Sequence, residues 1–290
     1  MIVLTGSTGF IGRHVLDQLL ISGEKVCVLL RQRQEKFPKQ VEQIVLDLMD
    51  YSKVTSSLKG LGARKLIHMA WYAEHGKYWE SEKNLDWVMA SLNLIQSFVV
   101  AGGEKVVVAG SSAEYDWDYG YCREDETPLS PRTLYGISKQ STFNILTRYC
   151  MNMSVDLAWG RIFIPYGTGE CEARLIPSLI RSLKNEVEPF SVNLRAYRDF
   201  LRVEDAARAI VHLLSPDAKG AYNISSGTPL RLLEVLRMIG SGLDSDISGY
   251  LAMERISSNE PLLLVGENQK LRALGWKPDY DFATGLEELL

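Results

Sequence analysis

The stretch Met1-Ile-Val-Leu-Thr-Gly-Ser-Thr-Gly-Phe-Ile-Gly-Arg-His14 decides the fold of this chain. Three β-prone apolar residues lead into a turn that carries Gly6, Gly9 and Gly12, and apolar residues then recur at helical spacing over 15–20. We predict a strand, a glycine turn and a helix. A side chain at Gly6 would obstruct the tight turn, and one at Gly12 would push the helix away from the strand. A side chain at Gly9 would keep a pyrophosphate from the N–H groups of the helix N-terminus, so the spacing favours a dinucleotide site.

The composition indicates a folded globular protein whose partners are small molecules. The chain has 290 residues, 46% of them apolar, and a formal net charge of −4, which argues against a large basic surface for nucleic acid. Its four cysteines have neither metal-ligand nor disulfide-framework spacing, so we expect reduced thiols and no metal. No segment approaches 18 uninterrupted apolar residues, and we expect a cytoplasmic protein with no membrane partner.

Strand-like and helix-like segments alternate through the first half of the chain. Short apolar runs at 25–30, 43–48, 65–70 and 105–109 have the length of strands, and a helical pattern covers 84–101. Strands that alternate with helices form right-handed crossovers and a parallel sheet. We therefore predict an α/β fold, a Rossmann-type doubly wound parallel sheet with a smaller C-terminal substrate-binding lobe.

The residues after the second and third predicted strands bear on the choice of dinucleotide. After the second strand an acid accepts the 2′-hydroxyl of NAD, whereas arginine accommodates the 2′-phosphate of NADP. Because Arg31 and Arg33 lie there and Arg13 could add a third cation, we expect NADP(H) to be preferred, with NAD(H) possible. A solvated basic loop is the competing interpretation, since Lys36 follows closely. Asp47 could accept a hydrogen bond from the adenine amine or cap the next helix.

A serine, a tyrosine and a lysine supply candidate acid-base chemistry. Ser111 follows the fifth predicted strand, and ligands bind at the carboxyl ends of the strands in open α/β sheets. Tyr135 and Lys139 are four residues apart in a segment that reads as a helix over 134–149, so both lie on one helix face. A nearby ammonium stabilises phenolate, which would bring the tyrosine closer to neutral pH.

These motifs, in this order, resemble those of the extended short-chain dehydrogenase/reductase family, which contains the NAD(P)-dependent nucleotide-sugar epimerases, dehydratases and 4-ketoreductases. The resemblance covers essentially the whole chain. The matching segments are Thr5-Gly-x-x-Gly-x-x-Gly12, Asp47-Leu48, His68-Met-Ala70, Ser111-Ser-x-x-Tyr115, Tyr135-x-x-x-Lys139, Arg161-x-Phe-x-x-Tyr-Gly167, Arg174-Leu-Ile-Pro177, Arg198-Asp-Phe-x-x-Val-x-Asp205 and Tyr222-Asn-Ile-x-x-Gly227.

The resemblance implies roles for the candidate catalytic and cofactor-binding residues. Tyr135 would be the acid-base, and Lys139 would hold the nicotinamide ribose and lower the pKa of the tyrosine. Ser111 would hydrogen-bond the same sugar oxygen as Tyr135. The expected cofactor-binding set is Gly6, Ser7, Thr8, Gly9, Phe10, Ile11, Gly12, Arg13, Arg31, Arg33, Asp47, Leu48, Met69, Ala70, Tyr135 and Lys139.

The resemblance also implies a nucleotide-diphosphate sugar as the substrate. Ser112, Arg174 and Arg198 form the expected substrate-binding set, because guanidinium groups suit a diphosphate. The alternative for the two arginines is a surface ion pair with Glu172 or Asp199.

Three departures from the family pattern narrow the expected activity. Many members have asparagine where this chain has Ile164, and many epimerases have one where it has Trp87. Both differences argue against a standard epimerase-type substrate pose. Ser112 and Ala113 stand in place of the acidic pair of the dehydratase Thr-Asp-Glu triplet, which argues against 4,6-dehydration.

The second half of the chain is expected to add a lobe over the strand ends. We predict helices at 176–183 and 204–214, a loop or strand region over 188–199, and a late strand at 221–225 that returns to the main sheet. The predicted division is a dinucleotide-binding domain at 1–167, to which 200–225 returns, and a substrate-binding lobe made of 168–199 and 226–290. A substrate would lie between the lobes. The resemblance further implies a homodimer that pairs the helices near 84–101 and 134–149.

Three functions remain open from the sequence. The first is an NADPH-dependent reductase of a 4-keto nucleotide sugar, in which hydride comes from the nicotinamide and the proton from Tyr135. The second is a nucleotide-sugar 4-epimerase that uses the same tyrosine and a retained NAD. The third is a non-catalytic NADP-sensing module, against which the presence of Ser111, Tyr135 and Lys139 argues.

Overall fold

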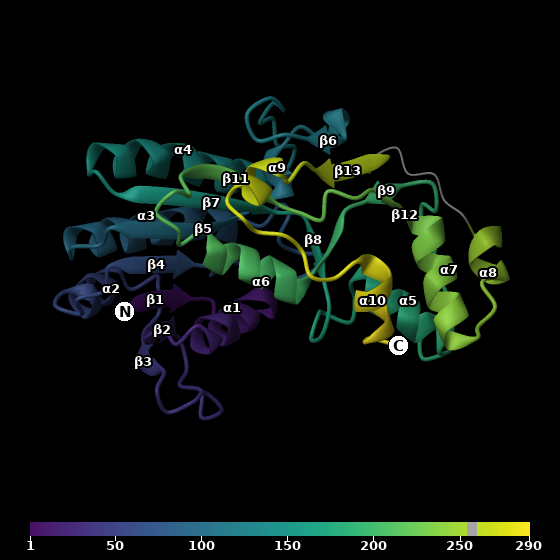
Figure 1. The fold of residues 1–290 in the computed structure, drawn as a ribbon, viewed down its shortest axis with the longest axis horizontal. Helices are drawn as coiled ribbons and strands as arrows, with labels where there is room; N and C mark the ends of the chain where they lie inside the picture. Colours follow the sequence, from purple (N-terminus) through teal and green to yellow (C-terminus); the bar gives the residue numbers. More distant parts are fainter. Residues whose placement is uncertain (254–259) are drawn as a thin grey trace.

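The computed structural model describes residues 1–253 and 260–290, and its central feature is a parallel sheet of seven strands (Figure 1). The strands lie in the order β11-β7-β5-β4-β1-β2-β3, and every neighbouring pair is parallel. Their bounds are β1 Ile2–Thr5, β2 Val26–Leu30, β3 Glu42–Val45, β4 Lys65–His68, β5 Lys105–Ser111, β7 Asp156–Ile162 and β11 Gly220–Ile224. The predicted fold class, a Rossmann-type doubly wound sheet, is confirmed.

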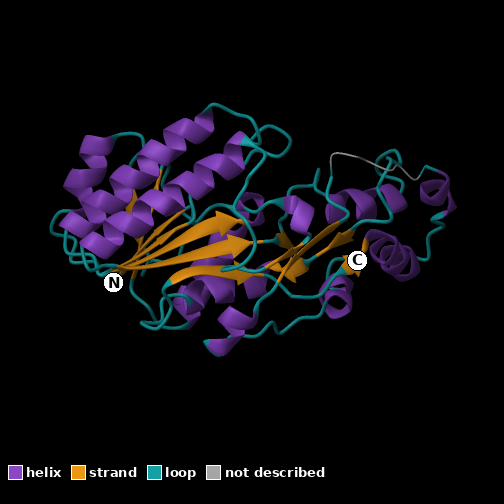
Figure 2. Cartoon of the chain, turned by 90° about the horizontal axis from the view of Figure 1, so that it is seen from above, coloured by secondary structure: helices purple, strands orange, loops and turns teal. Residues whose placement is uncertain are grey.

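Helices cover both faces of this sheet (Figure 2). On one face α1 (Phe10–Ile21) packs against α6 (Val203–His212), and their apolar residues join those of the strands in one core. On the other face lie α2 (Tyr51–Leu58), α3 (Lys83–Val100) and α4 (Leu134–Asn152), which share a second core with the sheet. The central strands are therefore buried on both sides, which explains their continuous apolar sequences.

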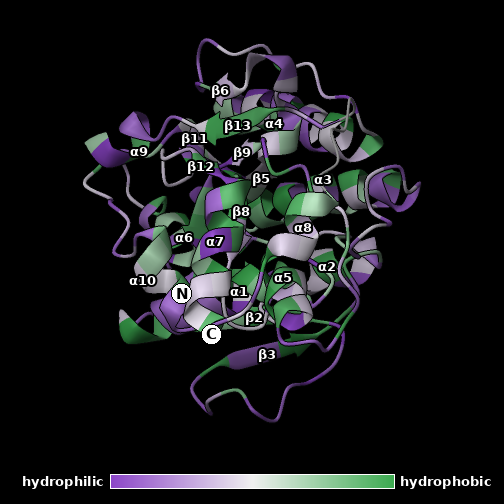
Figure 3. Ribbon diagram, turned by 90° about the vertical axis from the view of Figure 1, so that its right-hand side faces the viewer, coloured by the Kyte–Doolittle hydropathy of each residue, from purple (hydrophilic) through white to green (hydrophobic). Residues whose placement is uncertain are grey.

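β3 forms one edge of the sheet and is more exposed and more polar than the central strands. Its two terminal residues are exposed, and Figure 3 shows it largely hydrophilic. Polar residues on an edge strand oppose pairing with other chains. The strand ends at Val45, earlier than the predicted end at Leu48, because the chain leaves the sheet there and Leu46, Asp47 and Leu48 turn to line a cavity.

A second region lies beside the carboxyl ends of the strands and has a core of its own, built from residues between Tyr166 and Leu290. Two small sheets belong to it, one pairing β8 with β10 and one in the order β12-β9-β13-β6. Its elements are β6 Tyr121–Cys122, β8 Ile164–Tyr166, α5 Leu175–Leu183, β9 Tyr197–Arg198, β10 Phe200–Arg202, β12 Leu230–Arg231, α7 Leu232–Leu243, α8 Ser248–Ala252, β13 Leu263–Gly266, α9 Gln269–Ala273 and α10 Phe282–Glu287.

The late strand β11 returns to the main sheet, as the sequence predicts, and it pairs there with β7. The observed α5 and α6 lie within two residues of their predicted bounds, and the region over 188–199 contributes a strand only at Tyr197–Arg198. The division into two lobes stays a prediction, and residues 254–259 of the smaller predicted lobe lie outside the described residues. Within the described ranges, no helix combines the length and apolar character needed to cross a membrane.

Candidate active site

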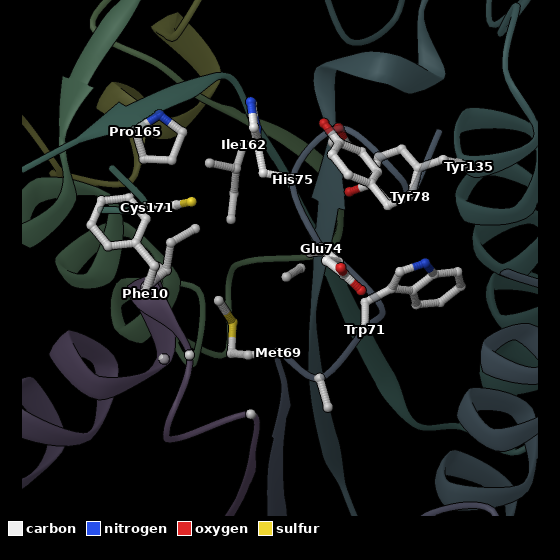
Figure 4. A pocket seen from close by; sticks show the side chains of 18 of the residues that line it. Phe10, Met69, Trp71, Glu74, His75, Tyr78, Tyr135, Ile162, Pro165 and Cys171 are labelled. Atoms are coloured by element: carbon white, nitrogen blue, oxygen red, sulfur yellow. The ribbon is translucent and has the colours of Figure 1, made fainter. Parts of the chain in front are cut away.

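A cavity of about 1060 Å³ lies at the carboxyl ends of β1, β2, β4 and β5 and reaches the second region. Figure 4 shows two walls: Phe10, Ile162, Pro165 and Cys171 on one side, and Trp71, Tyr78 and Tyr135 on the other. Of the residues predicted as sites, those that line it are Gly6, Ser7, Thr8, Gly9, Phe10, Ile11, Gly12, Arg31, Asp47, Leu48, Met69, Ala70, Ser111, Ser112, Tyr135, Lys139, Arg174 and Arg198. One cavity thus brings the cofactor, catalytic and substrate sets together.

The glycine turn is close-packed where the sequence requires glycine. Gly6 has φ +72°, and a Cβ on it would lie 2.7 Å from the backbone nitrogen of Ala70. A Cβ on Gly12 would overlap the carbonyl oxygen of Gly6, so this glycine sets the distance between α1 and β1. A Cβ on Gly9 would lie 3.3 Å from the same oxygen, a tight contact that leaves Gly9 free of any severe clash.

A buried hydrogen-bond chain lies beneath this turn. The Thr5 hydroxyl accepts the Ala70 N–H at 3.2 Å, and it donates its own proton to Nδ1 of His68 at 2.7 Å because the proton of the neutral ring lies on Nε2. Nε2 of His68 then donates to the Ser91 hydroxyl at 2.8 Å, which donates to the Trp87 carbonyl at 2.6 Å. Burial, with the Lys139 charge as a smaller cause, lowers the pKa of His68 to about 3 and keeps the ring neutral. This series of hydrogen bonds ties the ends of β1 and β4 to α3.

The three arginines predicted to bind the adenosine end of the cofactor differ in whether they face the cavity. Both Arg31 and Arg33 are exposed, but only Arg31 lines the cavity. Arg13 also turns away from the cavity, because its guanidinium donates to the carbonyl oxygens of Thr168 and Gly169 at 3.2 and 2.6 Å. It therefore links α1 to the loop after β8.

Asp47 lines the cavity, and its carboxylate accepts the N–H of Met49 at 3.0 Å. The alternative role considered for it, capping the next helix, is wrong. Asp50 caps α2 instead by accepting the N–H of Lys53.

Ser111 ends β5 and begins a short 3₁₀ turn, where a buried carboxylate fixes its backbone. Glu114 has no exposed surface and accepts the Ser111 N–H at 2.8 Å. The same carboxylate accepts N–H groups from Trp159 at 2.9 Å and from Arg161 at 2.8 Å, and Arg161 is itself 1% exposed. The ion pair lets both charges be buried beside the site. Glu114 was not among the site residues predicted from the sequence, although its place between Ser111 and Tyr115 was a signal.

Tyr135 and Lys139 project from the first turns of α4, as predicted. Nζ of Lys139 donates to the Ala109 carbonyl at 2.8 Å and lies 3.9 Å from the centre of the Trp71 ring. Burial lowers the pKa of Lys139 to about 7, and the Glu114 carboxylate opposes this shift. Burial raises the pKa of Tyr135 above its usual value, while a hydrogen bond with Ser111 opposes the rise. The expected lowering of the tyrosine pKa by Lys139 is therefore not found, and burial raises this pKa instead.

The loop over 71–82 supplies these rings, and none of its aromatic residues was among the predicted site residues. Around the Tyr135 ring, the Tyr78, Trp79 and Trp71 rings have their centres 4.8, 5.8 and 6.5 Å away, all edge-on. The Tyr135 N–H also donates to the Trp79 carbonyl at 2.9 Å. Four aromatic residues within nine positions, directly after a strand that ends at the cavity, were the available signal.

The two predicted substrate arginines lie in the cavity wall with partners other than those considered. Arg174 pairs with Glu170 at 3.3 Å, not with Glu172. Burial raises the pKa of Glu170 to about 7, against the opposing charge of Arg174. Arg198 donates to the carbonyl oxygens of Tyr197 and Pro261 and lies 3.6 Å from Glu260.

Asp199, the partner considered for Arg198, is buried and faces elsewhere. Its carboxylate accepts N–H groups of Ser226, Gly227 and Gly266. Its role is therefore to hold three backbone segments together.

The model of the NAD dependent epimerase/dehydratase family matches residues 2–225. The chain belongs to this family. It is accordingly an NAD(P)-dependent enzyme of the oxidoreductase and epimerase type, within the group of nucleotide-sugar epimerases, dehydratases and reductases.

Relatives in this family are similar along the length of the chain but distant. The CDP-abequose synthase of Salmonella typhimurium is 25% identical over 308 residues, covering 100% of this chain and 97% of the relative. The dTDP-6-deoxy-L-talose 4-dehydrogenase (NAD(+)) of Aggregatibacter actinomycetemcomitans is 26% identical over 238 residues, covering 80% of this chain and 86% of the relative. A Thermotoga maritima UDP-glucose 4-epimerase, solved with UDP-glucose, matches with a TM-score of 0.86 at 20% identity, covering 99% and 96% of the two chains. This last likeness shows the shared fold.

Two of the three departures from the family pattern, Ile164 and Trp87, lie in the wall of the cavity. Ile164 begins β8, and Trp87 lies on α3 with its ring 6.3 Å from that of Trp71. Apolar side chains thus occupy the places where many members carry asparagine.

Proposed function

We propose that this enzyme is an NADPH-dependent reductase of a 4-keto sugar linked to a nucleoside diphosphate. The observation that carries the proposal is the position of Arg31, which follows β2 directly and lines the cavity. An NAD-specific site presents an acid at this place, whereas a guanidinium suits a 2′-phosphate. A reductase must exchange its cofactor after each turnover and draws on NADPH, whereas an epimerase recycles a retained NAD.

Two features of the glycine turn support a bound dinucleotide. The Ser7 hydroxyl is buried and, within residues 1–253 and 260–290, has no hydrogen-bond partner. The N-terminus of α1 has no side-chain cap. Both can donate to pyrophosphate oxygens. We assign the pyrophosphate to Gly6–Gly12, the adenosine end to Arg31, Asp47 and Leu48, and the nicotinamide end to Met69, Ala70, Tyr135 and Lys139.

The catalytic proposal gives Tyr135 the proton transfer. When bound, the cofactor supplies the hydride that the keto carbon receives. The Tyr135 hydroxyl donates its proton to the carbonyl oxygen, and Ser111, which lines the same cavity, orients that oxygen. The buried Lys139 ammonium, held by the Ala109 carbonyl, stabilises the phenolate that results.

The diphosphate is assigned to Arg174 and Arg198, which reach the cavity from α5 and β9. Their guanidinium groups can each donate two parallel hydrogen bonds to phosphate oxygens. The names of the two curated relatives, with their CDP- and dTDP-linked sugars, agree with such a substrate. Glu170 pairs with Arg174 and would release it as the phosphates bind.

We also propose a homodimer formed through α3 and α4, in the cytoplasm where its substrates occur. Leu85 and Met89 on α3 are 52% and 51% exposed, and Ile137 and Ile145 on α4 are 46% and 49% exposed. Apolar side chains gathered on two neighbouring helices are typical of an interface. Light scattering should give the mass of two chains, and an Ile145→Glu variant should shift it towards one.

The test of the enzymatic proposal is the stoichiometry of NADPH oxidation. The enzyme is mixed with NADPH and a panel of 4-keto sugars linked to CDP, dTDP, UDP or GDP, and one NADPH should be oxidised per sugar reduced. Tyr135→Phe should lower kcat by roughly 10²–10⁴-fold while the NADPH Kd stays within about threefold. Interconversion of C4 epimers without net NADPH oxidation would establish the epimerase instead. Turnover that survives in Tyr135→Phe would refute the mechanism.

A further inference from the structure

The wall of the cavity beside Arg174 contains a buried carboxyl group with one unpaired oxygen. The Glu170 side chain is 3% exposed, and its Oε1 lies 3.3 Å from Nε of Arg174. Its Oε2 is buried and has no hydrogen-bond partner within residues 1–253 and 260–290. Buried carboxylates in folded proteins normally have partners for their oxygens, so a buried oxygen without one at the edge of a binding cavity indicates a contact that a ligand completes.

The surroundings of Glu170 allow its carboxyl to gain or lose a proton near neutral pH. Burial raises its pKa to about 7, against the opposing effects of the Arg174 charge and the Gly167 backbone. The ionised form attracts the Arg174 guanidinium. The protonated form can instead donate a hydrogen bond through the oxygen that has no partner.

Two titratable groups from the loop over 71–82 also lie near Arg174. His75 and Tyr78 line the same cavity (Figure 4), and the Arg174 charge acts on both. Burial and this charge lower the pKa of His75 from 6.5, so its ring is neutral at pH 7 and above. Burial raises the pKa of Tyr78 to about 12, so its hydroxyl keeps its proton.

The groups on α1 and on the loop after β8 have other partners or are exposed. Arg13 and His14 on α1 contact carbonyl oxygens of this loop at 2.6 and 3.4 Å. Glu172 is 77% exposed and pairs with Arg181, and the Cys171 thiol is exposed. Glu170 is therefore the buried acid that an anion bound to Arg174 would meet.

We propose that Glu170 binds the diphosphate in its protonated form: as the phosphates bind Arg174, the carboxyl takes one proton from solvent and donates a hydrogen bond to a phosphate oxygen. The inference rests on the proposed function, because it takes the diphosphate to lie at Arg174. Phosphates that bound this guanidinium would leave an ionised Glu170 buried, without its countercharge and beside two negative charges. Protonation removes that cost and gives the phosphate an additional donor.

The test measures proton uptake during binding and needs no turnover. CDP-, dTDP-, UDP- and GDP-glucose are titrated calorimetrically into the NADPH-loaded enzyme, and the tightest binder is then measured in two buffers of different ionisation enthalpy. The phosphates of a nucleotide sugar are fully ionised at neutral pH, so the ligand itself takes up no proton.

The expected uptake follows from the pKa of about 7 and full protonation of Glu170 in the complex. It should be about 0.1 proton per site at pH 6, about 0.5 at pH 7 and about 0.9 at pH 8. The Kd should correspondingly weaken about tenfold between pH 6 and pH 8.

Three variants separate Glu170 from its neighbours. Glu170→Gln carries a neutral donor at every pH, so it should abolish the uptake and make the Kd independent of pH, with binding up to about tenfold tighter than the wild type at pH 8. Glu172→Gln is the matched control on the same loop, and His75→Gln removes the other titratable group with a pKa below 7 near Arg174. Both should keep the wild-type uptake.

Each outcome decides the proposal. Binding by the wild type without proton uptake would overturn it, as would uptake that persists in Glu170→Gln or is lost in His75→Gln. Failure of all four nucleotide sugars to bind would also overturn it. Folding of the variants is checked by their NADPH Kd, since none of the three residues is in the proposed NADPH set. Failure of the proposed function shows differently, as absent NADPH oxidation with keto sugars that bind with proton uptake.

Discussion

Replacing Glu114 with glutamine is expected to destabilise the protein by about 3–5 kcal/mol. The carboxylate has no exposed surface, and its partner Arg161 is 1% exposed, so water cannot take over the lost interaction. Glutamine retains an oxygen that can accept the Ser111 N–H and changes the volume little. What it removes is the countercharge of a buried guanidinium, and an unpaired buried charge has a cost of this size.

The assay is urea unfolding at pH 7, and a surface ion pair provides the matched control. Glu104 pairs with Arg64, and these side chains are 58% and 70% exposed, so Glu104→Gln should cost less than about 1 kcal/mol. A double variant, Glu114→Leu with Arg161→Met, should recover much of the stability, because it removes both charges together. The reasoning is refuted if Glu114→Gln is no more destabilising than Glu104→Gln.

Glu114→Gln should also shift the pH dependence of turnover. The Glu114 carboxylate raises the pKa of Lys139 against the effect of burial, which lowers it to about 7. Without the carboxylate this pKa falls further, so the ammonium is lost at lower pH. The alkaline limb of the pH–kcat profile should therefore move to lower pH, and an unmoved limb would show that Lys139 does not respond to Glu114.

Three further predictions follow from single contacts. Arg31→Asp should shift cofactor preference from NADPH towards NADH, measured as the ratio of the two Kd values, and an unchanged ratio would make Arg31 a solvated loop cation. Gly12→Ala should weaken NADPH binding at least about tenfold, because its Cβ overlaps the Gly6 carbonyl, whereas Gly249→Ala, where the added Cβ meets open space, should leave the Kd unchanged. His68 has a folded pKa of about 3, below its unfolded value of 6.5, so the unfolded state binds more protons between these values and stability rises with pH there. His68→Gln should flatten that slope in unfolding experiments between pH 4 and 6.5, and an unchanged slope would assign the acid sensitivity to other groups.

The sequence was sufficient to predict the main sheet and to select motif residues that line the cavity, because both depend on local patterns. Apolar runs of strand length, glycine spacing and the Tyr135–Lys139 interval are readable within a few residues. The short strands of the second region, such as β9 at Tyr197–Arg198, have no such pattern. They exist because residues distant in sequence, such as Leu263, lie beside them, and strand propensity is set by such context.

The parts of the site that the sequence did not predict depend on contacts over long separations. The role of the buried Glu114 carboxylate becomes clear only in the folded structure, where β7 brings Trp159 and Arg161 alongside it. Arg13 was expected to face a phosphate, yet the loop after β8 offers its guanidinium two carbonyl oxygens from residues 155 and 156 positions away. Neither geometry follows from the local spacing of the residues.

The catalytic group and the neighbouring aromatic rings of the cavity depend on one structural element, the loop over 71–82. The Tyr135 N–H is held by the Trp79 carbonyl, and the Trp79 ring faces the cavity. Asn84 holds the same loop through Tyr78 and Ser81. A change that loosens the loop would therefore displace the Tyr135 phenol together with the Tyr78 and Trp79 rings and lower kcat. A change confined to the Trp79 ring leaves the backbone contact with Tyr135 intact, so it should lower kcat less than a change that loosens the loop.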